Sequence, residues 1–83
     1  MAAHPDSILP GLAAILARAA KVDPARITRD TRPREDFGLD SLAMIDLIVA
    51  AEDEFGVRIP DEDAERFQTV GDLADFIGRG VAG

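Results

Sequence analysis

The chain contains 83 residues with 16 acidic side chains, 9 Lys and Arg, one His and no Cys, so its formal net charge is −7. The absence of cysteine excludes disulfides, thiolate metal ligands and a cysteine nucleophile, and the excess of acid argues against nucleic-acid binding. The length and an apolar content of 47% predict one small domain, residues 1–83, with a hydrophobic core.

A first amphipathic helix is predicted from Ile8 to about Lys21. Its apolar residues recur with helical spacing, at Ile8, Leu12, Ile15, Leu16 and Ala19. We place Pro10 in its first turn or at its start, because an interior proline would break the hydrogen-bond ladder. Residues 24–39 contain two prolines and no sustained period, so they predict a long ordered loop, with Ile27 and Phe37 packed on the core.

A second helix is predicted from Asp40 or Ser41 to Phe55, with Gly56 closing it as the C′ residue. Its apolar residues fall on two faces of a helical wheel. The wider face, which we expect on the core, contains Met44, Leu47, Ile48, Ala51 and Phe55. A separate stripe contains Leu42, Ile45 and Val49, and is flanked by Asp46, Glu52 and Asp53. This stripe either packs inside the bundle, with Leu42 and Ile45 against the long loop, or faces a partner.

Two further helices complete the pattern. Asp61 is expected to cap a short third helix that continues over residues 61–67. Thr69 and Asp72 resemble a capping box for a fourth helix over residues 70–77, which the glycines that follow should end. The predicted fold is therefore all-α: a small four-helix bundle of three longer helices and one short one, with a long loop between the first two.

The acidic side chains are concentrated in one part of the chain. Residues 35–75 hold 13 acids and only 2 bases, whereas residues 1–34 hold 3 acids and 6 bases. Such an acidic block either presents a negative field to a basic partner or is simply a solvated surface. Asp61, Asp63 and Glu65 alternate, but a calcium loop would have glycine where Arg66 stands, so we expect no dedicated metal site.

Ser41 has the most interesting position, because it lies at the expected start of the second helix. Unpaired backbone N–H groups and the positive end of the helix dipole favour a phosphate there. The serine is a capping residue beside Asp40, a nucleophile, or the acceptor of a phosphorylated group attached by another enzyme. A nucleophile needs a base, and the single histidine is His4, near the N-terminus. The composition does not choose between the first and third interpretations.

Residues 35–42 read Glu-Asp-Phe-Gly-Leu-Asp-Ser-Leu, which resembles the D-x-G-x-D-S-L signature of acyl carrier proteins. The resemblance continues through residues 52–56, 59–63 and 69–73 with the right spacing, and it covers about residues 8–77. It implies a free-standing carrier and not an enzyme. Ser41 would bear a covalent 4′-phosphopantetheine arm derived from coenzyme A, and the arm would supply the thiol that the chain lacks.

The same resemblance implies the partners. Asp40 would position Ser41 and meet the phosphopantetheinyl transferase that loads the arm. Acyl-transferring and acyl-processing enzymes would dock their basic patches on a surface that coincides with the separate stripe of Leu42, Ile45 and Val49 and the flanking Asp46, Glu52 and Asp53. No apolar run is long enough to span a membrane and no signal peptide is present, so we expect a cytoplasmic monomer without stable membrane insertion.

The pathway stays open at this stage. Asp40 in place of a glycine before the serine argues against peptidyl carriers, and residues 56–63 favour fatty-acid or related lipid synthesis over polyketide or other secondary-metabolite routes. Pro33, Arg34 and Phe37 depart from the family pattern, and Arg32 and Arg34 place unusual positive charge near Ser41. An acyl chain could shelter among Leu47, Ile48, Ile59, Phe67 and Ile77, although ordinary core packing explains these residues equally well. The rival function is an unmodified acidic helical interaction domain.

Overall fold

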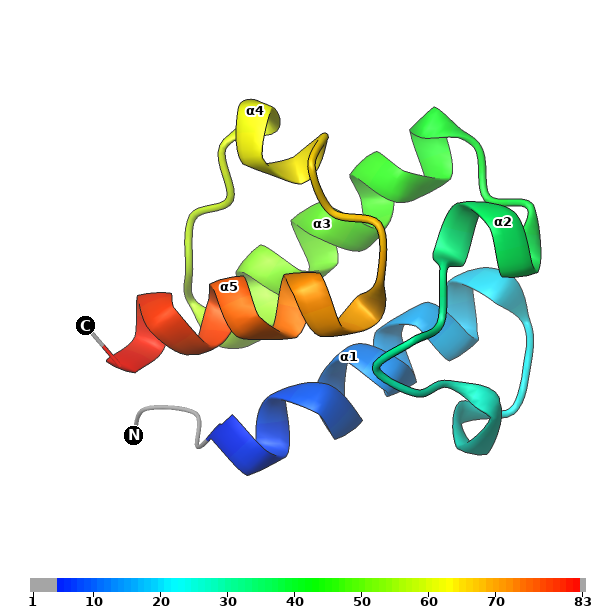
Figure 1. Cartoon of the computed structure of the whole chain (residues 1–83), viewed down its shortest axis with the longest axis horizontal. Coiled ribbons are helices and arrows are strands. Elements are labelled where there is room, and N and C mark those ends of the chain that lie inside the picture. Colours follow the sequence, from blue (N-terminus) through cyan, green and yellow to red (C-terminus); the bar gives the residue numbers. More distant parts are fainter. Residues whose placement is uncertain (1–4, 83) are drawn as a thin grey trace.

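The computed structural model describes residues 5–82, and every regular element in that range is helical (Figure 1). The elements are α1 (Pro5–Ala20), a 3-10 turn η1 (Pro24–Arg26), α2 (Pro33–Phe37), α3 (Ser41–Phe55), α4 (Asp61–Ala64) and α5 (Val70–Ala82). The predicted all-α bundle of three longer helices, α1, α3 and α5, is confirmed. Among these described residues, no helix is long and apolar enough to cross a membrane.

The core lies where α1 packs against both α3 and α5 (Figure 1). On α3, Met44, Leu47, Ile48 and Ala51 are buried, as the helical wheel predicts, and Phe55 is half-buried. Gly56 has φ 62° and ψ 36°, so it is the left-handed C′ residue expected at the end of α3. The bounds of this helix and the assignment of its core face are therefore confirmed.

α1 begins earlier than predicted, and the placement of Pro10 in its first turn is wrong. The helix starts at Pro5, so Pro10 lies in the second turn, where it cannot donate the usual backbone hydrogen bond. Tertiary packing explains why the first turn forms: Ile8 is only 1% exposed, and its Cδ1 lies 3.7 Å from the ideal Cβ position of Gly78 in α5. α1 ends as predicted, with Lys21 in the left-handed region.

The segment between α1 and α3 is not a continuous loop, because it contains η1 and α2. The carboxylate of Asp23 accepts the N–H of Ala25 at 2.9 Å and caps η1. α2 begins with Pro33, whose missing N–H costs nothing at a helix start, and the carboxylate of Asp36 accepts the N–H of Arg32 at 2.8 Å. Ile27 is buried as expected, and Phe37 packs half-buried against the core.

The last two helices differ from prediction at their ends. Asp61 is not the cap of α4: Pro60 occupies the N-cap position without a side-chain hydrogen bond, and the helix ends at Ala64, not at Phe67. Arg66 continues the chain as a turn. After this single helical turn, residues 65–69 leave the helix and bring Phe67 against Phe76 of α5, where the ring centroids are 5.4 Å apart.

The capping box of α5 is confirmed, but its predicted end is wrong. The N–H of Asp72 donates to Thr69 Oγ1 at 3.1 Å, and the N–H of Thr69 donates to the Asp72 carboxylate at 3.2 Å. The helix continues through Gly78 and Gly80 to Ala82. A Cβ at Gly80 would lie 3.4 Å from Val57, so the glycines bring α5 close to its neighbours and packing outweighs their poor helix propensity.

Candidate functional site

Ser41 is the first residue of α3 and is exposed. Its neighbour Asp40 is the N-cap: the Asp40 Oδ1 accepts the N–H of Ala43 at 2.8 Å, and the Asp40 carbonyl accepts the N–H of Met44 at 3.0 Å. The capping role that Ser41 was considered for is therefore filled by Asp40. The hydroxyl of Ser41 is held at the surface beside the backbone N–H groups of the first turn, where an anion is favoured.

The predicted separate stripe on α3 lies on the surface. Leu42, Ile45 and Val49 are 68%, 57% and 49% exposed, so they do not pack against the preceding loop. Asp46 and Asp53 are also exposed on the same helix. We call the six predicted residues, Leu42, Ile45, Asp46, Val49, Glu52 and Asp53, the α3 stripe. An apolar stripe bordered by carboxylates suits a partner with apolar and basic side chains.

Glu52 differs from the other members of the α3 stripe. Its side chain is half-buried, and Glu52 Oε2 accepts the backbone N–H of Ile59 at 2.8 Å. Glu52 is therefore not simply an exposed charge beside the apolar stripe. The carboxylate joins α3 to the segment that leads into α4, and the sequence does not signal this bond because the two residues are seven positions apart.

A groove runs between α3 and α4 and begins at the candidate attachment residue. Ser41 itself lines it, together with apolar residues of α3 and with Ile59 and Ala64. Arg34 of α2 also lines it, as do the carboxylates of Asp61 and Glu65. We call this the α3–α4 groove. Sequence reasoning considered Asp61 as a helix cap and both Asp61 and Glu65 as metal ligands, and their place in the same groove as Ser41 follows from the tertiary structure. In the described part of the chain, no group of three or more His or acidic side chains is arranged to hold a metal ion.

Known proteins resemble the chain over nearly its whole length. A family model described as "Phosphopantetheine attachment site" matches residues 10–77. The chain belongs to the acyl carrier proteins of this family. It is 47% identical to the acyl carrier protein of Thermosynechococcus vestitus over 75 residues, which cover 90% of this chain and 93% of the relative. It is 40% identical to that of Acidothermus cellulolyticus, over 93% of this chain and 92% of the relative.

The fold agrees with this assignment. The structure of the acyl carrier protein from Enterococcus faecalis superposes with a TM-score of 0.81 at 29% identity, covering 94% of this chain and 99% of that one. The family carries a covalently attached 4′-phosphopantetheine and acts as a carrier and not as a catalyst, so the prosthetic group and the non-enzymatic role expected from the sequence are confirmed. Membership also implies a phosphopantetheinyl transferase and acyl-processing enzymes as partners.

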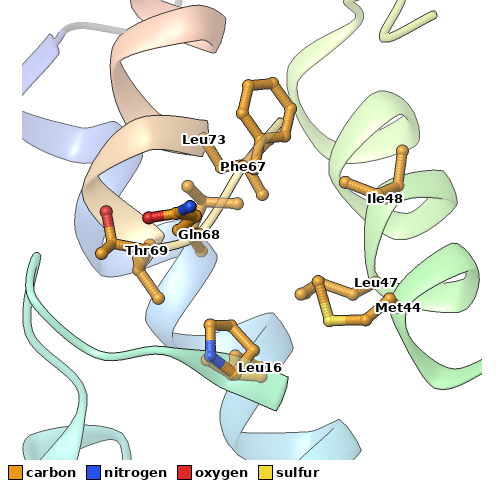
Figure 2. A pocket seen from close by; sticks show the side chains of 11 residues that line it. Leu16, Met44, Leu47, Ile48, Phe67, Gln68, Thr69 and Leu73 are labelled. Atoms are coloured by element: carbon orange, nitrogen blue, oxygen red, sulfur yellow. The ribbon is translucent and has the colours of Figure 1, made fainter. Parts of the chain in front are cut away.

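The carrier also has a small apolar cavity between α1, α3 and the start of α5 (Figure 2). Leu47, Ile48 and Phe67 line it, as the sequence suggested for a sheltered acyl chain, but Ile59 and Ile77 do not. Its volume is about 20 Å³, enough for roughly one water molecule. In this conformation the bundle is closed, and Ile59 and Ile77 belong to the ordinary core.

Proposed function

We propose that Ser41 bears the phosphopantetheine arm and that the chain carries acyl intermediates on it as thioesters for fatty-acid or related lipid synthesis. The observation that supports the attachment residue most is its geometry: an exposed hydroxyl at the first position of a 15-residue helix, directly after a capping carboxylate. The residue also lies inside the span matched by the family.

The residues around Ser41 suit a phosphodiester. Asp40 fixes the start of α3 through the N–H of Ala43, which leaves the N–H groups of Ser41 and Leu42 directed toward an anion at the helix start. The arm supplies the thiol that a chain without cysteine cannot provide. Ser41 contributes only its hydroxyl oxygen, at a fixed position on the surface. Asp40 holds the start of α3, and therefore the position of that oxygen, and its side chain remains accessible to the loading transferase.

The α3 stripe is proposed as the surface that partner enzymes recognise. Its exposed apolar side chains can enter a shallow apolar surface on the partner, and Asp46 and Asp53 can pair with basic residues at the rim. Charge complementarity of this kind mainly raises the rate of encounter. This arrangement favours several partners with basic docking patches over one permanent partner.

The relatives favour a lipid route. Besides the carriers named above, the meromycolate extension acyl carrier protein of Mycolicibacterium smegmatis is 39% identical over 93% of this chain and 78% of its own length. That relative is named for meromycolate extension. We therefore retain fatty-acid or related lipid synthesis as the proposed pathway, with a polyketide or other secondary-metabolite route as the alternative.

The attachment proposal is tested by incubating the protein with coenzyme A and a phosphopantetheinyl transferase, followed by intact-mass spectrometry. One phosphopantetheine should be added to the unaltered protein and none to Ser41→Ala. Ser7→Ala is the matched control, since Ser7 is the only other serine, and it should be loaded normally. Loading of Ser41→Ala would refute the assignment, and failure of the unaltered protein with several transferases would favour an unmodified interaction domain.

The docking proposal is tested by charge reversal. Asp46→Lys should slow transfer of acyl groups to a partner synthase by several-fold at low salt, with an unchanged melting temperature, because an exposed charge contributes little to stability. Asp30→Lys makes the same charge change in an exposed loop position outside the α3 stripe and should leave transfer nearly unchanged. Equal slowing in both variants would show that only net charge matters.

A further inference from the structure

The α3–α4 groove has an uneven distribution of charge. Three of the side chains that line it are carboxylates, Glu52, Asp61 and Glu65, and its single cation is Arg34. Arg34 belongs to α2, the element that directly precedes α3 in the chain, so this cation and Ser41 reach the groove from neighbouring segments. Only Gly38, Leu39 and Asp40 separate α2 from Ser41.

A phosphodiester on Ser41 would experience this distribution directly. The carboxylates of Asp61 and Glu65 repel it from the α4 side, whereas the Arg34 guanidinium and the N-terminus of α3 attract it. A guanidinium also binds two phosphate oxygens at once, which a single ammonium group does not do with the same geometry. The charges therefore favour one location for the phosphodiester, between Arg34 and the start of α3.

We propose that Arg34 is a positioning residue that binds the phosphodiester of the arm and directs the rest of the arm along the α3–α4 groove. This inference rests on the proposed attachment at Ser41. The uncharged part of the arm fits the groove chemically: its methyl groups match Ile45, Ile48 and Ile59, and its amide N–H groups can donate to carboxylates of the groove. Without Arg34 the arm would remain attached but would spend less time on this surface.

The arm can be observed selectively because the chain contains no cysteine. A thiol-reactive spin label on the loaded protein therefore marks the end of the arm alone. In the unaltered protein, the label should broaden the methyl resonances of Ile45, Ile48 and Ile59 more than that of Ile15, a buried residue of α1 that does not line the groove. The ³¹P resonance of the unlabelled arm reports separately on the environment of the phosphodiester.

Arg34→Gln should shift the ³¹P resonance and reduce the population of groove-bound arm by a factor of about 1.5–5, the range expected for one exposed ion pair. Arg34→Lys should retain part of the effect. Arg32→Gln is the matched control, because it removes another exposed charge two residues away that pairs with Glu35 and does not line the groove. High salt should reduce the difference between Arg34→Gln and the unaltered protein.

Intact mass is measured first, so that the two proposals fail in different ways. If Ser41 cannot be loaded, the proposed function fails and the role of Arg34 falls with it. If loading is complete but Arg34→Gln and Arg32→Gln give the same ³¹P shift and the same broadening, the positioning role is refuted while the carrier function stands. Uniform broadening of Ile15 and the groove methyls in the unaltered protein would equally refute it.

Discussion

Glu52 provides the sharpest test of how this surface is built, because one carboxylate belongs to the α3 stripe and also supports the fold. Glu52 Oε2 accepts the N–H of Ile59 at 2.8 Å in a half-buried position. Glu52→Ala removes a hydrogen bond to a charged group, which contributes about 1.5–3 kcal/mol. It also removes a negative charge from the last turns of α3, a gain of about 0.3–1 kcal/mol. The net expectation is a loss of about 1–2 kcal/mol.

The assay is thermal and urea unfolding followed by helical circular dichroism. For a domain of this size, the predicted loss lowers the melting temperature by about 5–15 °C. Asp53→Ala is the matched control: it removes the same charge at the neighbouring, exposed position, and it should leave stability unchanged or slightly raised. Glu52→Gln keeps an acceptor and should fall between them. Equal melting temperatures for Glu52→Ala and Asp53→Ala would refute the structural role of Glu52.

Two further predictions concern α5. Backbone N–H groups of residues 68 and 69 donate to Asp72 and lower the pKa of its carboxyl below the ordinary 3.8. Because the pKa of Asp72 is lower in the folded state than in the unfolded state, its ionised carboxylate stabilises the fold above the unfolded-state pKa, and this stabilisation is lost as the pH falls through the folded-state pKa. In thermal melts across pH, Asp72→Asn should therefore melt at a lower temperature than the unaltered protein at pH 7 and at nearly the same temperature at pH 2. A difference in melting temperature that does not change with pH would contradict this. Gly71→Ala should be destabilised by about 1–3 kcal/mol in urea unfolding, since its Cβ would lie 3.0 Å from the Arg29 carbonyl oxygen. The added Cβ of Gly78→Ala would make only an ordinary contact, 3.7 Å from Ile8 Cδ1, so this variant should gain up to about 1 kcal/mol of stability. The packing argument would be refuted if Gly78→Ala were less stable than Gly71→Ala.

Local chemistry explains which parts of the fold could be predicted from the sequence. The start of α3 depends on a carboxylate cap at Asp40, and its end depends on a left-handed glycine at position 56, both within one turn of the helix. The two faces of α3 follow from periodicity alone. The capping box at Thr69 and Asp72 is equally local. Each of these signals depends only on residues that are close together in the sequence. The sequence alone could therefore predict the positions of Ser41 and of the exposed stripe beside it.

The features that prediction missed depend on contacts between distant segments. α5 continues past Gly78 because that glycine packs near Ile8, 70 positions earlier in the chain. The bond between the Ile59 N–H and Glu52 was not predicted, because nothing in the residues next to Glu52 indicates it. The sequence did indicate unusual positive charge near Ser41, but only the tertiary structure shows that Arg34 lines the groove.

The closed cavity and the Glu52 bond together constrain how this carrier could shelter its cargo. A space of about 20 Å³ holds one water, so an acyl chain can enter only if the wall moves. Residues 67–69 form the part of the wall that joins α4 to α5, and residues of α1, α2, α3 and α5 form the rest (Figure 2). Because the Ile59 end of the same α4 segment is bonded to Glu52, outward movement of the whole segment would break a charged hydrogen bond. If the whole segment moves, burial of the cargo must offset the loss of this bond, and short or polar acyl groups gain the least from burial.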